Sequence, residues 1–139
     1  MKKLFILLIS LIFLTANFCF ALNSYDYYGQ KTGSYKQNGT TINQYDKYGQ
    51  KTGSYKTNGS TTVQYDKYGS KVGSFKTNSN GVTTSYDKYG QKTGSFKTNS
   101  NGVTTQYDKY GSKVGTFKTD SSGRTTHYDK YGRKVGSYR

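Results

Sequence analysis

The chain has 139 residues, with 21 lysines and arginines against seven aspartates and no glutamate, and its formal net charge is +14. It has 16 tyrosines, no proline, no tryptophan and a single cysteine, Cys19, so a framework of intramolecular disulfides is excluded. No nucleophile stands with a partner base and no metal-ligand pattern is present. We therefore predict a protein that is not an enzyme, with no catalytic residues, no metal site and no cofactor.

The first 21 residues have the layout of a secretory signal peptide. Two lysines follow Met1, residues 4–18 are almost wholly apolar, and Cys19 and Ala21 place small residues before a cut after Ala21. The apolar run is short for a membrane span, so we expect no retained span and a secreted or periplasmic protein. A retained anchor is the alternative. The leader and the lysine-rich composition suggest a bacterial source.

Residues 22–139 form one predicted domain, which is organised by a repeated pentapeptide, Tyr-Asp-Lys-Tyr-Gly. A near copy opens the series, and successive copies are 20 or 21 residues apart. The repeats start at Tyr25, Tyr45, Tyr65, Tyr86 and Tyr107, and a partial one starts at Tyr128. Aliphatic residues are scarce here, so any core must be made mainly of aromatic rings.

Each repeat contains two turn signals with a strand-forming run between them. Asp and Gly in Asp-Lys-Tyr-Gly favour a tight turn, in which the Asp accepts backbone hydrogen bonds and the Gly takes positive φ. The second signal is Asn-Gly in the short repeats and Asn-Ser-Asn-Gly in longer ones, so the extra residue falls in this turn. The runs 71–77 and 82–86 read as strands, with Val82, Thr84 and Tyr86 on one face. Gly73 leaves room on its face for a ring from the next strand.

About eleven strands of this kind predict an all-β fold, a single twisted antiparallel meander sheet of hairpins. The alternative is a β-solenoid or fibril in which each repeat forms one rung. In a stack of rungs, the equivalent lysines of successive repeats would lie about 4.8 Å apart, whereas a meander doubles that separation. Repulsion between these lysines therefore favours the meander. A one-sided sheet must still cover its apolar face by curling, by adding a second sheet or by binding a partner.

Most of the polar residues that could suggest chemistry have a simpler interpretation. Each repeated Asp is a lone acid, in most repeats beside a Lys, which indicates a turn-forming role. His127 occupies a position that holds Gln or Ser in other repeats, so we predict a structural role for it. The surface of interest consists of tyrosines and lysines on which sugar rings or bases could stack while ammonium groups meet anions. Its candidate ligand-binding residues are Tyr48, Tyr68, Tyr89, Tyr110, Tyr131, Lys67, Lys88, Lys109 and Lys130.

The segment 123–133, Gly-Arg-Thr-Thr-His-Tyr-Asp-Lys-Tyr-Gly-Arg, resembles the YD repeat of Rhs-type proteins. The pairs Tyr65-Asp66, Tyr86-Asp87 and Tyr107-Asp108, with their following glycines, match that pattern, and the resemblance covers residues 25–139. Lys134 departs from it, because an apolar residue usually follows Gly-Arg. The resemblance implies a hairpin-built sheet, placement outside the cell or in its envelope, and carbohydrate contact. A weaker similarity is to curli-type fibre subunits, through Gln44, Gln64 and Gln106.

These observations predict a secreted, non-enzymatic β-repeat protein that binds or decorates an envelope or extracellular surface. Its expected partners are anionic glycans, lipopolysaccharide or another polyanion, because basic residues are spread over every repeat. The alternative is a self-associating structural subunit of an extracellular, amyloid-like fibre.

Overall fold

The computed structural model of the protein describes residues 21–139. The predicted signal peptide falls almost entirely on residues 1–20 and so lies outside the described residues; the first strand begins at Ala21, one residue before the predicted start of the domain. Within residues 21–139, no helix is long and apolar enough to cross a membrane.

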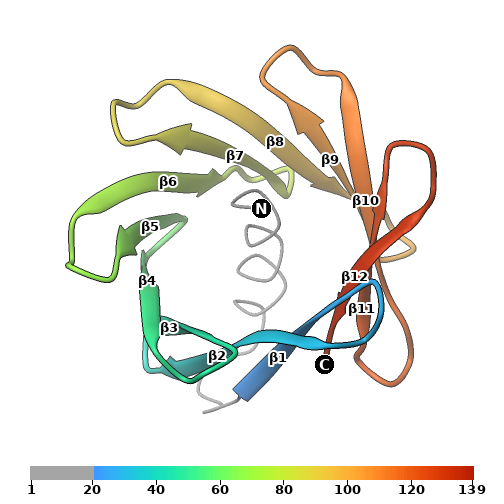
Figure 1. Cartoon of the computed structure of the whole chain (residues 1–139). Helices are drawn as coiled ribbons and strands as arrows, with labels where there is room; N and C mark the ends of the chain where they lie inside the picture. Colours follow the sequence, from blue (N-terminus) through green and yellow to red (C-terminus); the bar gives the residue numbers. More distant parts are fainter. Residues whose placement is uncertain (1–20) are drawn as a thin grey trace.

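Twelve β-strands follow one another along the chain and curl around a central axis (Figure 1). The strands are β1 (Ala21–Asp26), β2 (Lys31–Asn38), β3 (Thr41–Asp46), β4 (Lys51–Asn58), β5 (Thr61–Asp66), β6 (Lys71–Thr77), β7 (Val82–Asp87), β8 (Lys92–Thr98), β9 (Val103–Asp108), β10 (Lys113–Thr119), β11 (Thr125–Asp129) and β12 (Lys134–Tyr138). Each pairs antiparallel with the next, and β12 pairs with β1, so the sheet closes into a barrel. The predicted antiparallel meander is confirmed, with one strand more than expected, and the rung arrangement is not adopted.

The Asp-Lys-Tyr-Gly turns join each odd-numbered strand to the next strand, at one end of the barrel. In the turn after β5, Asp66 Oδ1 accepts hydrogen bonds of 2.9 Å from the backbone N–H groups of Tyr68 and Ser70. Gly69 has φ 86°, and its N–H donates to the Asp66 carbonyl at 3.1 Å. This is a type I turn closed by a left-handed glycine. The predicted roles of Asp and Gly are confirmed, because the final glycine of all six such turns has positive φ.

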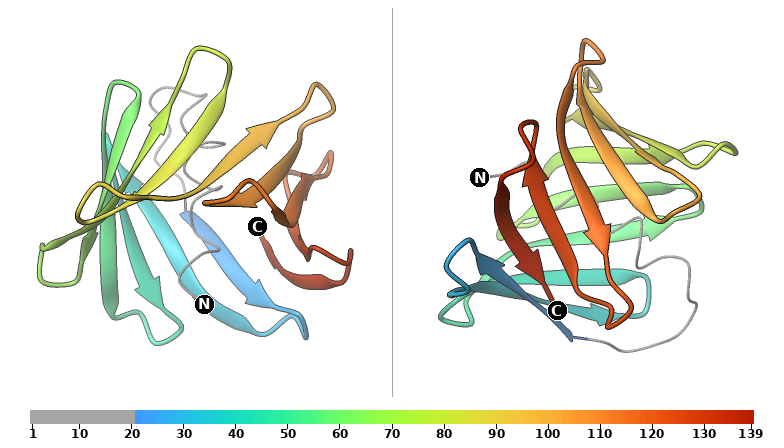
Figure 2. Two further views of the ribbon diagram at one scale, coloured as in Figure 1. Left: turned by 90° about the horizontal axis from the view of Figure 1, so that it is seen from above. Right: turned by 90° about the vertical axis from the view of Figure 1, so that its right-hand side faces the viewer.

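The second set of turns lies at the opposite end of the barrel (Figure 2). In the short repeats Gly39, with φ 56°, begins a two-residue turn between β2 and β3. In the longer repeats Asn78 copies the aspartate turn, since its Oδ1 accepts from the N–H groups of Asn80 and Val82. The extra residue of the 21-residue repeats therefore lies in this turn, as predicted, and the strands keep their inward and outward faces.

A β-bulge in each even-numbered strand was not predicted. Gln64 pairs with Gly73, but the next residue, Tyr65, pairs with Lys71, so Val72 is an extra residue that bends the strand. Comparable register shifts occur in the other repeats, between β1 and β2, β3 and β4, β7 and β8, β9 and β10, and β11 and β12. Regularly placed bulges increase twist and curvature, which is what a meander needs to close on itself.

The glycine after each bulge is explained by a close backbone approach. A Cβ atom on Gly73 would lie 2.7 Å from the carbonyl oxygen of Tyr86 on β7, and the next nearest side-chain atom is Gln64 Oε1 at 3.9 Å. The ring expected across Gly73 is not among the atoms nearest to it, whereas at the equivalent Gly115 the imidazole Nε2 of His127 would lie 3.0 Å from such a Cβ. A neighbouring carbonyl oxygen occupies the space because the bulged strand bends toward β7.

The barrel closes with the same register that joins the repeats to one another. Gly136, Ser137 and Tyr138 of β12 pair with Asp26, Tyr25 and Ser24 of β1, just as Gly115 to Phe117 pair with Asp129 to His127. Two backbone hydrogen bonds between Asn23 and Arg139, of 2.8 and 3.0 Å, extend this ladder. The strand of the partial last repeat thus pairs with the first strand of the chain, as the strands of successive repeats pair elsewhere.

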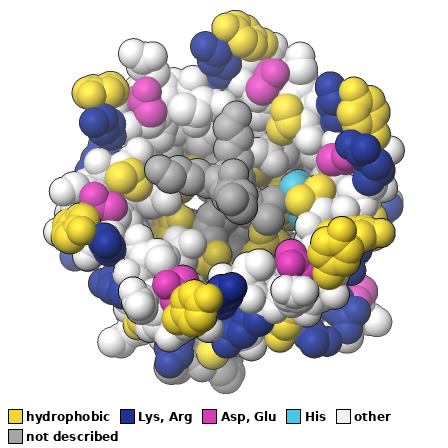
Figure 3. Space-filling model, in the orientation of Figure 1, with side chains coloured by type: hydrophobic (Ala, Val, Ile, Leu, Met, Phe, Trp, Pro, Cys, Tyr) yellow, Lys and Arg dark blue, Asp and Glu magenta, His cyan; other side chains and the backbone are white. Residues whose placement is uncertain are grey.

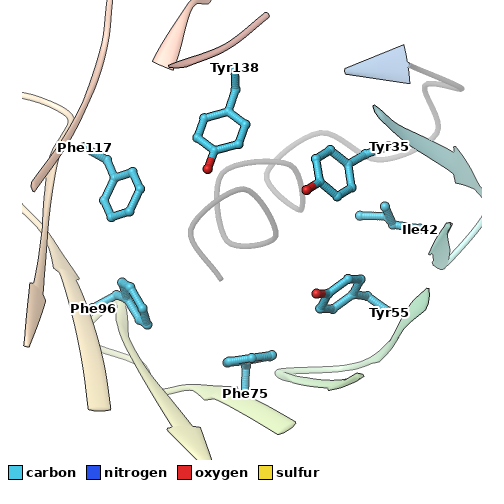
Figure 4. Close-up of a cluster of buried hydrophobic side chains, with 7 residues drawn as sticks. All are labelled: Tyr35, Ile42, Tyr55, Phe75, Phe96, Phe117 and Tyr138. Atoms are coloured by element: carbon cyan, nitrogen blue, oxygen red, sulfur yellow. The ribbon is translucent and has the colours of Figure 1, made fainter. Parts of the chain in front are cut away.

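The core consists mainly of aromatic rings, as predicted. One buried ring from each even-numbered strand points into the barrel, together with Ile42 from β3 (Figure 4). The six rings are Tyr35, Tyr55, Phe75, Phe96, Phe117 and Tyr138. The tyrosine that starts each Tyr-Asp pair lies on the other face, and the alternation along β7 is as predicted, with Thr83 and Ser85 buried inside.

Candidate functional site

The exposed tyrosines of the chain gather at one end of the barrel. The second tyrosine of each pentapeptide stands at the tip of its turn, and all six such turns lie at the same end because the meander alternates its two turn types. We call this set of turn tyrosines and their preceding lysines the crown (Figure 3). The crown residues are Tyr28, Tyr48, Tyr68, Tyr89, Tyr110 and Tyr131, with Lys47, Lys67, Lys88, Lys109 and Lys130.

Every residue of the predicted ligand surface therefore lies in a turn at the same end of the barrel. The crown tyrosines are 72–83% exposed. Within each turn the lysine lies over the ring that follows it: Lys67 Nζ is 4.8 Å from the centre of the Tyr68 ring, and Lys88 Nζ is 4.8 Å from that of Tyr89. Such a cation–π contact at an exposed site contributes about 0.5–1 kcal/mol. It holds the ammonium group close to a ring whose surface stays largely accessible.

The turn of the first repeat departs from this pattern, and the turn of the last repeat keeps it and adds an arginine. The first has Tyr27 in place of the lysine, and the Tyr27 and Tyr28 rings meet edge to face with centroids 5.1 Å apart. In the last, Arg133 Nε lies 2.7 Å from Asp129 Oδ2, and its guanidinium group lies 5.4 Å from the centre of the Tyr131 ring. Two hydrogen bonds from Arg133 lower the pKa of Asp129. The bond from the backbone N–H has the larger effect, and the bond from the side chain has the smaller one.

The acidic residues of the crown end are committed to the turns. In five of the six turns the Asp Oδ1 accepts backbone hydrogen bonds from the residues two and four positions later; Asp46 and Asp87 are examples. Asp26 accepts from the Gln30 N–H. A lysine begins every even-numbered strand beside these turns. The crown end thus presents ammonium groups beside tyrosine rings, around carboxylates that accept hydrogen bonds from the backbone.

A second row of rings and cations on the outer wall was missed in the sequence analysis. Arg139 lies 4.6 Å over the Tyr25 ring, and two lysines, Lys36 and Lys118, lie 5.6 Å over the rings of Tyr45 and Tyr128. The cation of each pair comes from the strand next to that of its tyrosine. The alternation of side chains along each strand indicated that these cations and tyrosines share the outer face. Which cation lies over which ring depends on the register between neighbouring strands.

His127 lies inside the barrel rather than in the crown. It is buried, and its imidazole stacks on the Phe117 ring with centroids 4.3 Å apart and planes 20° apart. Burial lowers the pKa of His127 to about 4, against the opposing attraction of Asp129, so the imidazole is neutral at pH 7. This packing agrees with the predicted structural role, but the buried Nδ1 has no hydrogen-bond partner among the described residues.

Between residues 21 and 139, no group of three or more His, Cys, Asp or Glu side chains could hold a metal ion.

The fold defines the class of protein: a twelve-stranded antiparallel barrel made of a repeated hairpin pair, with aromatic rings inside and a crown of tyrosines and lysines at one end. No protein-family model matches the chain, and no curated protein matches it either.

Proposed function

We propose that the protein is a secreted, non-enzymatic binding module that attaches to an anionic glycan, such as lipopolysaccharide, in an envelope or extracellular matrix. The observation that carries this proposal is the crown. It repeats one Tyr–Lys pair around a single rim, with the ring exposed and the ammonium group 4.8–4.9 Å from its centre.

The crown combines the two interactions that a charged glycan needs. Aromatic faces pack against the C–H groups of sugar rings, and lysines meet sulfate, phosphate or carboxylate groups. Each single contact is weak, but a polymer that reaches several neighbouring turns gains avidity from effective concentration. The spacing of the contacts is fixed because every turn is held by its own Asp and Gly.

The fibre alternative has less support. Every one of the twelve described strands is paired on both sides, so no free edge is available to template the addition of another chain. A closed barrel is therefore a poor building block for cross-β assembly unless it first opens.

Titration with heparin tests the proposal. We expect binding at about 50 mM salt that weakens strongly at about 300 mM, because counterion release drives contacts of this kind. Replacing Tyr68, Tyr89 and Tyr110 together with Ala should weaken binding further at either salt concentration, since it removes the stacking faces.

A charge-matched pair of variants then locates the site. Lys67, Lys88 and Lys109 changed to Gln remove three charges from the crown, whereas Lys56, Lys76 and Lys97 changed to Gln remove three from the outer wall. We expect the crown variant to lose much more affinity. Equal losses would mean that only net charge matters, and undetectable binding at low salt would reject the proposal.

A further inference from the structure

The inner wall of the barrel contains a cavity of about 250 Å³ that is separate from the crown tyrosines. It lies among β8, β9, β10 and β11 and the end of β7, toward the Asp-Lys-Tyr-Gly turns. Its lining residues are Ser85, Thr93, Gly94, Phe96, Gln106, Tyr107, Asp108, Val114, His127 and Asp129. A space of this size accommodates a molecule of about a dozen non-hydrogen atoms.

Sequence differences between repeats change which hydrogen bonds the interior side chains of this part of the wall can make. In the second repeat Gln64 Nε2 donates to the hydroxyl of Tyr55 at 2.9 Å, and Gln44 faces the Tyr35 hydroxyl in the same way at 3.5 Å. On the cavity side the corresponding rings are phenylalanines, which have no hydroxyl group.

Two polar side chains on this side consequently face rings that cannot bond to them. Gln106 pairs across the ladder with Phe96, and His127 pairs with Phe117. Both are at least nine-tenths buried, and His127 Nδ1 has no partner among the described residues. Buried polar groups normally find a partner in the protein, in ordered water or in a bound molecule, so the His127 Nδ1 atom is a hydrogen-bonding group that a bound molecule can use.

The charge of the lining narrows the class of ligand. Although 19 basic residues lie in residues 22–139, neither Lys nor Arg lines the cavity, and its charged members are Asp108 and Asp129. An anion would find no counter-charge there, and a cation would have to approach through the surrounding lysines. A neutral molecule with hydroxyl groups on its edges suits the Gln106 amide and the His127 imidazole, while its apolar face packs on Phe96.

We propose that this cavity binds a single ring of a neutral carbohydrate, with Phe96 against the C–H face and Gln106 and His127 at the hydroxyl groups. The site is independent of the crown: its ligand is uncharged and its binding does not depend on counterion release. Affinity for a free monosaccharide is weak, as the small number of atoms dictates.

The single histidine of the chain gives a direct readout. In the exported protein, the imidazole proton signals of His127 are followed by NMR during titration with glucose, galactose, mannose and N-acetylglucosamine. Glucosamine and glucuronate serve as cationic and anionic probes of similar shape. We expect a saturable shift with at least one neutral sugar, of unchanged midpoint between about 50 and 300 mM salt, conditions that separate it from crown binding.

A matched pair of substitutions tests the location. Val114 and Val72 occupy equivalent bulge positions, but only Val114 lines the cavity. Val114→Trp should weaken sugar binding at least about tenfold by filling the space, and Val72→Trp should leave it unchanged. Gln106→Leu, which removes the amide, should also weaken it.

Three results would overturn the proposal: no saturable shift with any neutral sugar, equal weakening by the two tryptophan variants, or a response to glucosamine or glucuronate alone. Heparin binding by the same samples reports separately on the crown, so failure of one proposal is distinguishable from failure of the other.

Discussion

The residue that faces each interior ring decides whether the polar side chains of that part of the barrel wall are hydrogen-bonded to one another. Burial raises the pKa of the hydroxyl groups of Tyr35, Tyr55 and Tyr138, so these tyrosines stay neutral hydrogen-bonding groups at any ordinary pH. Gln44 and Gln64 bond to two of these hydroxyl groups. His127 stacks on Phe117 instead, and burial of its imidazole links its protonation to folding in mild acid.

The pKa of His127 predicts a loss of stability in mild acid. Its pKa is about 4 in the folded protein and about 6.5 in an unfolded chain. Between these values the unfolded state binds more protons, so the free energy of unfolding falls as pH drops from about 6.5 toward 4. We expect His127 to account for a decrease on the order of 2 kcal/mol over this window.

Thermal or denaturant unfolding at several pH values measures this effect. His127→Gln places at this position the residue found in three other repeats and should flatten the dependence between about pH 6.5 and 4.5. An identical slope in the variant would show that the folded pKa is close to normal.

At the scale of the element, glycine has two different structural roles in each pair of hairpins. Turn glycines such as Gly49 have positive φ, here 84°, with open space around them. Glycines after the bulge such as Gly53 lie against a carbonyl oxygen on the neighbouring strand. The first kind is required by local backbone conformation, and the second by the approach of two bent strands.

These two kinds of glycine should respond differently to alanine. Gly49→Ala adds a Cβ in open space and should cost about 1 kcal/mol for the left-handed conformation. Gly53→Ala would place its Cβ 2.7 Å from the Tyr65 carbonyl oxygen, so strands must shift, and we expect a loss of about 2–3 kcal/mol. Chemical denaturation of both variants measures the difference, and a smaller loss for Gly53→Ala than for Gly49→Ala would contradict the bulge explanation.

At the scale of the whole molecule, closure depends on the shortest strand pair in the barrel. Three residue pairs join β1 to β12, whereas five or six join β3 to its two neighbours. The Asn23–Arg139 backbone bonds and the Arg139 guanidinium over the Tyr25 ring strengthen this junction. Because stability of a repeat array comes from contacts between neighbours, the closing pair adds one neighbour contact to each terminal repeat.

Removal of residues 135–139 should open the barrel. The edges of β1 and β11 would lose their partner strand, and unpaired edges associate with one another. We expect the truncated protein to form oligomers in size-exclusion chromatography with light scattering and to melt at a lower temperature. The control, Arg139→Gln, keeps the backbone ladder and should remain monomeric. A truncated protein that stays monomeric with an unchanged melting temperature would show that closure contributes little.

Features that depend on near neighbours in the chain could be predicted without the fold. The positive φ of Gly69, the backbone bonds to Asp66, the position of the extra residue in the Asn78 turn and the alternation along β7 all follow from local turn chemistry and the two-residue period of a strand. The antiparallel meander follows from the shortness of these turns. The residues of the candidate surface, Tyr68 and Lys67 among them, were also predictable, because exposed turn tips carry them.

Features that depend on the sum of many repeats could be known only from the closed barrel. A bulge at Val72 changes twist by a small amount, and six such bulges together bring β12 beside β1, which no local pattern reveals. Closure then separates Phe117 inside from Tyr128 outside, gathers the crown on one rim and stacks His127 on Phe117. The cavity beside His127 arises for the same reason: whether a buried imidazole has a partner depends on the strand beside it, and the register that places that strand is a property of the closed barrel.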